Sequence, residues 1–393
     1  MQPPRPWNLA LGGLLSLAVA MGIGRFVYTP ILPLMAEALP LTKSQAGLIA
    51  SANFAGYLVG ALAAASRLPG SRRTWLVAAL FLSAATTTLT AGLSGVVALS
   101  LVRFAGGVAS AFVLVFSSSV ILGRLAEAGA SRLSSVHFAG VGTGIAISAA
   151  LVSTLAAAGV GWRVHWIASG GLALLAVPLV VFLVPPDSRV TGPAAQAGGV
   201  ALTPRLMSLI LSYGLFGLGY VVTATFLVAI VRGSAEVRHI EPVVWIAVGL
   251  SAIPSVALWT ALGKRLGVYP AYALACLVEA VGVALSVLVT SASGVILASV
   301  FLGGTFMGIT ALGLVGARTL SASDPARVIA LMTAAFGLGQ IVGPTLAGWL
   351  FDRTGSFTLP SLLAAGALVV AAILGGAVDG KLLRPAEKPQ PAP

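Results

Sequence analysis

Long apolar stretches dominate this chain and restrict it to membrane folds. A helix that crosses the hydrocarbon core of a bilayer needs about 20 predominantly apolar residues. Charged residues make up 8% of the 393-residue sequence, against about 25% in soluble domains, so the chain lacks the charge to cover a water-facing surface. We therefore predict an all-α membrane protein with twelve spans. They lie at residues 9–34, 44–66, 74–92, 96–122, 134–158, 162–184, 205–231, 240–262, 269–290, 294–317, 327–351 and 357–378.

Basic residues are distributed unevenly between the two sets of connections. With both termini in the cytoplasm, fifteen of the 22 Lys and Arg residues fall in cytoplasmic segments and five in the outer loops. This bias is typical of the positive-inside rule, and it accounts for the net charge of +12 without a nucleic-acid partner. We expect a multi-pass protein of the bacterial inner membrane, surrounded by lipid, with both termini cytoplasmic.

The second half of the chain repeats the first. Met21–Pro30 (MGIGRFVYTP) has a counterpart 195 residues later in Phe216–Thr225 (FGLGYVVTAT), and further matches follow in order in the second, fourth and fifth spans of each half. Repeats of this kind place the substrate site of a transporter near the bilayer midplane, between the halves. We predict two six-helix halves related by a pseudo-two-fold axis. The divisions are a first half at 1–184, a cytoplasmic linker at 185–204, a second half at 205–380 and a disordered cytoplasmic tail at 381–393.

Small residues form stripes on the fifth and eleventh spans. Gly140, Gly144 and Ser148 lie along one, and Gly339, Gly343 and Gly348 follow the other. Small side chains let transmembrane helices approach closely. We interpret both stripes as packing surfaces between the halves.

Several short motifs resemble those of the major facilitator superfamily. The loop after the second span is similar to G-x-x-x-D-R-x-G-R-R but lacks the Asp. Arg103 and Gly107 match part of an R-x-x-Q-G motif, and Gly339–Phe357 resembles G-P-x-x-x-G-x-L-x-D-x-T-G. The segments GIGRFVYTPILPLM and QAGLIASANFAGYLVGAL resemble the YbfB/YjiJ-type branch more specifically. The resemblance covers nearly the whole chain and implies the twelve-helix facilitator fold and a transport role, but it supplies no substrate.

The basic loops are candidates for a conformational gate. In the superfamily the Asp that is missing here helps to lock the halves in the outward-facing state, so we expect a weak lock. The alternative is that the basic side chains only hold topology, or that Arg67 bonds the C-terminal carbonyls of a neighbouring helix. The gate candidates are Arg67, Gly70, Arg72, Arg73, Lys264 and Arg265.

The resemblance implies that the first, fourth, seventh and tenth spans line a cavity. Arg25 lies in the first of them, and its planar guanidinium can hold a carboxylate through two parallel hydrogen bonds. Arg25 and Tyr28 are three residues apart, so we expect them on one helix face. The substrate-binding candidates are Arg25, Tyr28, Asn53, Tyr57, Tyr220, Thr223 and Gln340. The alternative is that Arg25 bonds helix carbonyls and that the others make ordinary interhelical hydrogen bonds.

Three residues are candidates for proton coupling. Glu279 is a carboxyl in the middle of the ninth span, a helix that the resemblance places toward lipid, where a protonated Glu can simply bond a neighbour. Arg103, in the fourth span, is a coupling candidate that also suits a structural role. His137 can titrate near neutral pH, although a lone His at a membrane interface is more often a passive surface residue.

The sequence contains no motif for catalysis, for a cofactor or for a metal ion. We therefore expect no enzyme, but a monomeric secondary transporter that moves a small carboxylate-type organic anion by alternating access, coupled to H⁺. The alternative is proton-driven efflux of amphipathic drugs or metabolites, in which aromatic side chains do the binding. Those side chains are Phe26, Phe226, Trp245, Trp259 and Phe306. A receptor or scaffold is a third possibility, disfavoured because no sizeable soluble domain is present.

Overall fold

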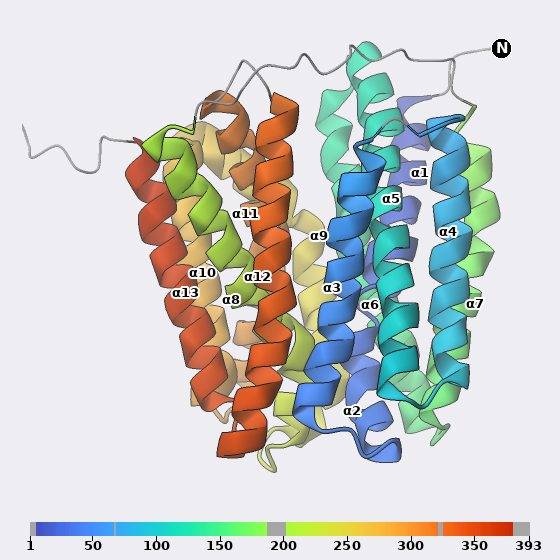
Figure 1. The fold of residues 1–393 in the computed structure, drawn as a ribbon, viewed down its shortest axis with the longest axis vertical. Helices are drawn as coiled ribbons and strands as arrows, with labels where there is room; N and C mark the ends of the chain where they lie inside the picture. The colour runs from blue at the N-terminus through green and yellow to red at the C-terminus, as the bar shows by residue number, and fades with distance from the viewer. Residues whose placement is uncertain (1–4, 67, 187–201, 321–324, 380–393) are drawn as a thin grey trace, which may run out of the picture.

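The computed structural model describes residues 5–66, 68–186, 202–320 and 325–379 (Figure 1). Every regular element in these ranges is a helix. Twelve helical stretches within them are long and apolar enough to cross a bilayer, and each agrees with a predicted span to within five residues. The prediction of an all-α protein with twelve spans is confirmed.

The helices follow one another in two series of six spans. The first series consists of α1 (Pro6–Leu17), η1 (Ala18–Ile23), α2 (Tyr28–Ala38), α3 (Lys43–Ala64), α4 (Arg72–Leu89), η2 (Thr90–Gly92), α5 (Val96–Glu127), η3 (Ser131–Leu133), α6 (Ser134–Ala157) and α7 (Trp162–Leu183). The second consists of α8 (Pro204–Arg232), η4 (Arg238–Ile240), α9 (Glu241–Leu266), α10 (Val268–Leu288), α11 (Ala292–Leu320), α12 (Pro325–Thr354), α13 (Thr358–Gly376) and η5 (Ala377–Asp379). We call α1–α7 the N half and α8–α13 the C half.

The duplication is visible in the turns between helices. Gly70 and Gly267, which are repeat equivalents, both have a positive φ, of 89° and 95°. Gly159 and Gly355 form a second pair, each with a φ of 71°. Glycine adopts this region without the steric cost that a side chain imposes. The same turns therefore recur at matching places of the two halves.

The first span is broken, where we predicted an uninterrupted helix. Between α1 and α2 the chain first forms the π-helix η1, whose turns are wider than those of an α-helix. Gly24 N donates to Val19 O at 2.8 Å and Phe26 N donates to Met21 O at 3.1 Å. Residues 24–27 then form a turn. Gly22 permits this path, since a Cβ there would lie 2.4 Å from the Cα of Gly144 on α6. The equivalent α8 continues as one helix.

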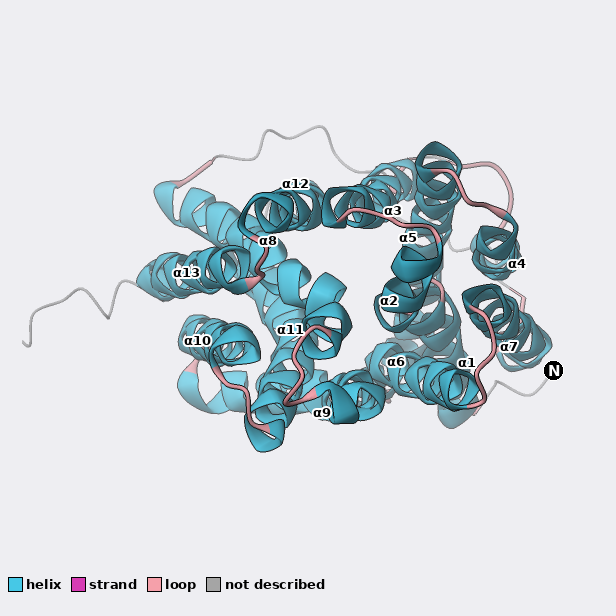
Figure 2. Ribbon diagram, turned by 90° about the horizontal axis from the view of Figure 1, so that it is seen from below, coloured by secondary structure: helices cyan, strands magenta, loops and turns pink. Residues whose placement is uncertain are grey.

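The two halves meet along two pairs of helices. Figure 2 shows the C half and the N half as two groups that adjoin where α3 packs on α12 and α6 on α9. Glycines allow these contacts: a Cβ on Gly47 would lie 2.1 Å from the Pro344 carbonyl oxygen, and one on Gly142 2.6 Å from that of Gly249. Thus α3, α6, α9 and α12, the second, fifth, eighth and eleventh spans, flank the interface.

The loops that connect the helices lie at the two ends of the molecule. We call the end that holds the start of α1, the α3–α4 loop and the α9–α10 loop the terminal end, and the other, with the α2–α3 and α12–α13 loops, the opposite end (Figure 1). The predicted tail 381–393, most of the predicted linker 185–204 and Arg67 lie outside the described residues. The predicted half boundaries and the cytoplasmic position of the terminal end remain predictions.

Candidate functional site

Arg25 lies in the break of the first span, midway between the two ends. Its side chain is buried, with 4% of its surface exposed. The guanidinium carbon lies 4.4 Å from the ring centroid of Tyr57, 4.7 Å from that of Phe54 and 5.4 Å from that of Phe26. Rings so close to a cation stabilise it through their negative faces, and the Tyr57 hydroxyl lies within hydrogen-bonding reach of the guanidinium. Nε and Nη2 have no hydrogen-bond partner among the described residues.

Arg103 is the second buried arginine of the N half. From α5 it donates through Nη1 to the Gly24 carbonyl at 2.7 Å and through Nη2 to the Arg25 carbonyl at 2.8 Å. A broken helix leaves carbonyls without their usual N–H partners, so this guanidinium supplies the donors that the backbone lost. The alternative of a structural role, which we kept for Arg103, fits this geometry.

Tyr28 and Asn53 also have partners in the protein. The Tyr28 hydroxyl donates to the Ala46 carbonyl at 2.8 Å, and Asn53 Nδ2 donates to the Arg103 carbonyl at 2.7 Å. The expected helix face shared by Arg25 and Tyr28 does not form, because residues 24–27 are a turn. Side chains of Arg25, Tyr28, Asn53 and Arg103 nevertheless line one cavity of about 10 Å³, which has the size of a single water molecule.

The C half faces Arg25 with aromatic rings. Tyr220 is the repeat counterpart of Arg25, and its ring stacks against Phe306 and Phe336 with centroids 5.8 Å from each. Phe216 lies 5.2 Å from Tyr220 on the same helix. Gln340 on α12 donates through Nε2 to the Tyr220 hydroxyl. We call Phe216, Tyr220, Phe306 and Phe336 the aromatic stack.

Phe26 connects the two groups of side chains. Its ring meets Phe306 edge-on at 5.9 Å and Trp245 at 6.4 Å, across the boundary between the halves. Two other rings considered for an exporter lie elsewhere: Phe226 packs on Phe357 at 4.8 Å, and Trp259 Nε1 donates to the Gly304 carbonyl at 2.7 Å. Arg25, Tyr57 and the aromatic stack therefore form one continuous candidate site near the middle of the molecule.

Several polar atoms around this site have no hydrogen-bond partner in the described part of the chain. They include Gln340 Oε1, Thr223 Oγ1, Asn53 Oδ1, Arg103 Nε and Trp245 Nε1. Buried polar atoms are rarely left unpaired in folded proteins, so these acceptors and the Thr hydroxyl can bind a solute or water.

Glu279 is fully buried on α10, the ninth span. Both of its carboxyl oxygens lack a hydrogen-bond partner within the described ranges. We expected a lipid-side position, where a protonated Glu can bond a neighbour. The side chain is instead buried inside the C half, within reach of Thr305 on α11. An ionised carboxylate in that position would be buried without compensation.

His137 is also buried, contrary to the expectation of a surface residue. It lies on α6 with no exposed surface, and Nε2 is 3.2 Å from Ser118 Oγ. The reason is Gly13 on α1, where a Cβ would lie 2.2 Å from His137 Nδ1, so the missing side chain leaves room for the imidazole. His137 therefore lies roughly three helical turns from Arg25 along α1, apart from the candidate site.

The arginines that follow the α3–α4 loop at the terminal end form hydrogen bonds within the N half. Arg73 donates through Nε to the Val184 carbonyl at 2.7 Å and through Nη2 to that of Val181 at 2.8 Å. Arg72 Nη1 donates to Ser119 Oγ at 2.8 Å. Arg73 thus caps the C-terminus of α7, which is the kind of bond that we considered for Arg67. Lys264 and Arg265, in the last turn of α9, are exposed.

The opposite end is held closed by bonds between the halves. Asp352, at the end of α12, accepts hydrogen bonds from the backbone N–H groups of Lys43 at 3.0 Å and Ser44 at 2.9 Å. These groups form the N-terminus of α3, which favours an anion. Arg232 bonds Glu37 at 3.1 Å and Glu241 at 2.6 Å.

The bonded pairs at the opposite end reveal the symmetry axis. Glu37 and Arg232 are 195 residues apart, as are Thr29 and Ala224, whose side chain and carbonyl are joined at 2.6 Å. Residues that contact their own repeat equivalents must lie beside the pseudo-two-fold axis. Asp352 and Arg232 were missing from our candidates, although Asp352 belongs to the quoted motif and Arg232 to the repeat.

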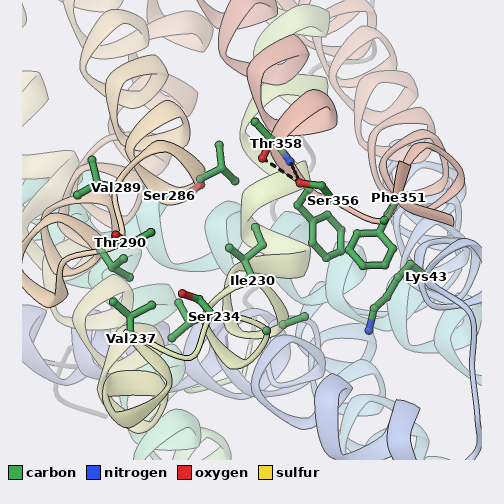
Figure 3. A pocket seen from close by; sticks show the side chains of 17 residues that line it. Lys43, Ile230, Ser234, Val237, Ser286, Val289, Thr290, Phe351, Ser356 and Thr358 are labelled. Atoms are coloured by element: carbon green, nitrogen blue, oxygen red, sulfur yellow. Dashed lines mark hydrogen bonds between the residues drawn. The ribbon is translucent and has the colours of Figure 1, made fainter. Parts of the chain in front are cut away.

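A cavity of about 320 Å³ lies at the opposite end (Figure 3). It is lined by the ends of α8, α10 and α12 and by the loops that follow them. The polar side chains in the lining are Lys43, Ser234, Ser286, Thr290, Ser356 and Thr358. Its one basic residue, Lys43, is 5.8 Å from the Phe351 ring. The cavity is remote from Arg25 and brings none of the candidate residues together, so we do not assign the substrate to it.

Comparison with known proteins identifies relatives of this fold. A family profile described as "Uncharacterised MFS-type transporter YbfB" matches residues 17–375. Two proteins of Agrobacterium vitis, each named "Putative tartrate transporter", are 33% identical over 128 residues, which is 32% of this chain and 28% and 30% of theirs. The chain thus matches less than a third of the length of these curated relatives.

Solved transporters share the overall architecture. A crystal structure of a mutant of the nucleoside transporter NupG superposes with a TM-score of 0.73 at 16% identity, covering 94% of this chain and 99% of that one. A bacterial homologue of the human lysosomal transporter Spinster, in an inward-facing and occupied conformation, gives 0.72 at 14% identity, covering 97% and 98%. At these identities the likeness establishes the fold alone.

Proposed function

This chain belongs to the YbfB-type family of major facilitator superfamily transporters, and we propose that it carries a small organic anion across the membrane as a secondary transporter. The anion is a carboxylate, and it binds between the halves at Arg25. We place the terminal end in the cytoplasm and the protein in the bacterial inner membrane, acting as a monomer.

The observation that carries this proposal is that two of the three guanidinium nitrogens of Arg25 are unpaired among the described residues. A cation inside a membrane protein is costly and is normally paired with a carboxylate or with carbonyls. Arg25 has neither at Nε and Nη2, and in the described part of the chain no ion pair includes it. A bound carboxylate would accept both hydrogen bonds and restore electroneutrality. The names of the two Agrobacterium relatives, which concern a dicarboxylic acid, support the same class.

We further propose that Glu279 carries the coupling proton. Its oxygens are buried and unpaired, so the carboxyl is stable in this state only with a proton attached. Release of that proton requires a state in which water or a cation reaches α10. A carboxyl that charges and discharges between conformations is what proton coupling needs. Arg103 and His137 are weaker candidates, because Arg103 is bonded to carbonyls and His137 is remote from Arg25.

Transport would proceed by rocking of the halves about α3–α12 and α6–α9. The predicted small-residue stripes serve this contact only in part: a Cβ on Gly348 would lie 2.1 Å from the Lys43 carbonyl oxygen of the other half. The rest of that stripe packs on α8 within the C half, and Gly140 and Gly144 pack on the first span within the N half, so the prediction that both stripes lie between the halves was wrong for most of their residues. Closely packed backbones can slide or tilt without interlocking side chains. The closed opposite end corresponds to a state that opens toward the terminal end.

Export of amphipathic compounds is the second candidate, favoured by the aromatic stack and Phe26. The charge of the best ligand separates the two. In proteoliposomes, labelled carboxylates should be taken up by the wild-type protein and not by Arg25→Gln at equal incorporation. Arg25→Lys, which keeps the charge but not the planar fork, should retain part of the uptake. Normal carboxylate uptake by Arg25→Gln would reject the anion carrier and leave the exporter.

A further inference from the structure

The side chains around Arg25 also restrict the rest of the substrate. Three rings, of Phe26, Phe54 and Tyr57, lie within 5.4 Å of the guanidinium carbon. Behind Phe26 is a cavity of about 10 Å³ whose lining is aromatic and aliphatic and comes from both halves. Its members include Phe26 and Ile145 of the N half and Tyr220, Trp245 and Phe306 of the C half. A solute held by Arg25 therefore meets mainly apolar surface beyond its charged group.

Two guanidinium groups lie at the break, and of these Arg25 is the one with an unpaired terminal nitrogen in the described part of the chain. Both terminal nitrogens of Arg103 are bonded to the Gly24 and Arg25 carbonyls, and only its Nε is unpaired. Using them for a ligand would leave two buried carbonyls unpaired, which is unfavourable. Other unpaired polar atoms nearby include Gln340 Oε1, Asn53 Oδ1 and Trp245 Nε1. The two amide oxygens are acceptors that repel a second carboxylate, and the indole N–H is a single neutral donor.

We propose that the substrate is a monocarboxylate with a flat aromatic body, rather than a hydroxylated dicarboxylate. This rests on the proposed function: the carboxylate binds Arg25, and the ring enters the apolar cavity between Phe26, Trp245 and Phe306. In the closed arrangement this cavity has room for about one water molecule, so the ring enters as the halves move apart. Aromatic pairs favour offset or edge-on contact, which these three side chains already adopt with one another.

A dicarboxylate with hydroxyl groups fits the same surroundings poorly. Its second charge would be buried without a cation, and its hydroxyls would lose water without gaining enough partners. The aromatic acid loses little hydration from its ring and gains contact with three side chains. We therefore infer a substrate that differs from tartrate, the acid in the names of the two Agrobacterium vitis relatives, which match less than a third of their own length.

The test is a ranking of affinities on the purified full-length protein in lipid nanodiscs, by isothermal titration calorimetry. The probes are 3-phenylpropionate, propionate, succinate, tartrate and the neutral 3-phenylpropanamide. We expect 3-phenylpropionate to bind at least about tenfold more tightly than tartrate or succinate, the gain of one or two aromatic contacts. The amide should bind more weakly by a similar factor, since it lacks the charge.

Substitution of one ring should reduce this preference selectively. Phe306→Leu should weaken 3-phenylpropionate about fivefold or more while leaving propionate unchanged, because the carboxylate contact is kept. Phe182→Leu is the matched control, as Phe182 is 81% exposed on α7 and should leave the ranking unaltered. Trp245→Leu, which removes another ring of the same cavity, replaces Phe306→Leu should the latter not yield folded protein. The ranking of ligands on the wild-type protein requires no variant.

The outcomes separate this inference from the proposed function. Tighter binding of tartrate or succinate than of 3-phenylpropionate, abolished by Arg25→Gln, would overturn the aromatic preference and keep the anion carrier. Equal binding of the amide and the acid, unaffected by Arg25→Gln, would reject the anion carrier itself. Loss of propionate and 3-phenylpropionate binding in equal measure in Phe306→Leu would also overturn the inference, since the ring would then serve the fold.

Discussion

Arg25 and Arg103 are two buried guanidinium groups in the same half that differ in the use of their donors. Arg103 is bonded to two carbonyls at 2.7 and 2.8 Å. Arg25 is surrounded by rings and keeps two nitrogens unpaired. Both are almost completely buried. A charge inside the membrane is therefore insufficient to identify a binding site; what matters is whether the fold already satisfies its donors.

Two carboxyl groups repeat this contrast. Asp352 accepts hydrogen bonds from two backbone N–H groups at the start of α3 and joins the halves. Glu279 is buried with both oxygens unpaired. Arg103, whose two terminal nitrogens are bonded and whose Nε alone is unpaired, and Asp352, whose two oxygens are bonded, hold parts of the molecule together. The unsatisfied members, Arg25 and Glu279, are the groups that we assign to transport.

The strongest test of this comparison exchanges each arginine for glutamine. Arg25→Gln should weaken carboxylate binding about thirtyfold or more, because a buried charged contact contributes about 2–5 kcal/mol. Its stability should stay within about 1 kcal/mol of the wild type, since few of its donors are bonded. Binding is measured by calorimetry, and stability by the fraction of monodisperse protein after heating.

Arg103→Gln should show the reverse pattern. It leaves two buried carbonyls without partners, at about 1–3 kcal/mol each, so the heated protein should aggregate at a clearly lower temperature. The fraction that stays folded should bind carboxylates within about threefold of the wild type, because Arg103 holds the break rather than the ligand. An Arg103→Gln protein that is as thermally stable as the wild type but does not bind carboxylates would contradict the comparison. Arg103 would then be assigned to the binding site.

Glu279→Gln extends the comparison to the unpaired carboxyl. The amide keeps the size of the side chain but cannot carry a proton on and off. Substrate-for-substrate exchange in proteoliposomes should remain, whereas accumulation driven by a pH gradient should fall to a ratio of about one, because the coupling step is lost. Glu127→Gln, at an exposed glutamate, is the matched control. Wild-type accumulation by Glu279→Gln would assign this carboxyl to structure.

Arg25→Lys sharpens the account of Arg25 itself. Lysine restores the positive charge but offers a point charge in place of a planar fork. We expect an affinity about tenfold below the wild type, between those of the wild type and Arg25→Gln. The same calorimetric titration measures it. An affinity equal to the wild type would mean that charge alone, without the two parallel hydrogen bonds, determines binding.

Asp352→Asn should give the smallest effect, on the balance between closed and open states. Losing the negative charge at the α3 N-terminus removes about 1 kcal/mol from the closed opposite end, which shifts populations about fivefold. Ala36 is buried at that end, so Ala36→Cys in a Cys276→Ala background should label slowly, and about fivefold faster after Asp352→Asn. Ser131→Cys, at an exposed position of the terminal end, corrects for reagent and expression.

Rapid labelling of Ala36→Cys before any change at Asp352 would contradict the closed state. In that case the protein at rest opens at the opposite end. The terminal end would then be held closed by contacts that we did not predict. Arg72 and Arg73 could not supply them, since their hydrogen bonds stay within the N half.

Much of the fold was predictable because the bilayer imposes simple requirements. Length and hydropathy located the twelve spans to within five residues. The repeat identified equivalent positions of the two halves, and the structure shows that Gly70 and Gly267 among them share a positive φ. The break at residues 24–27 was missed. The local sequence is apolar enough for a continuous helix, and the break is stabilised by Arg103, which is 78 residues away.

The candidate site was predictable only in part, because its members also come from segments that are far apart in the chain. Arg25 stood out as a charge in an apolar stretch, and Tyr220 as its repeat equivalent. Phe54, Phe216 and Phe336 were not selected, although Phe54 and Phe216 lie three and four residues from Tyr57 and Tyr220 on their helices. Aromatic residues are common on both lipid-facing and inward faces, so sequence alone does not tell which rings gather around a cation.

The sequence by itself determined that this chain spans a membrane twelve times, is built from a duplicated half and carries few buried charges. These properties follow from the cost of exposing polar groups to hydrocarbon, which acts on each segment separately. The tertiary structure decided which buried charges are used by the fold and which remain unpaired. Hydrogen bonds such as those from Arg103 to the first span, or from the start of α3 to Asp352, join segments far apart in the chain. Only the packing of the helices brings those partners within reach, and it leaves Arg25 and Glu279 without them.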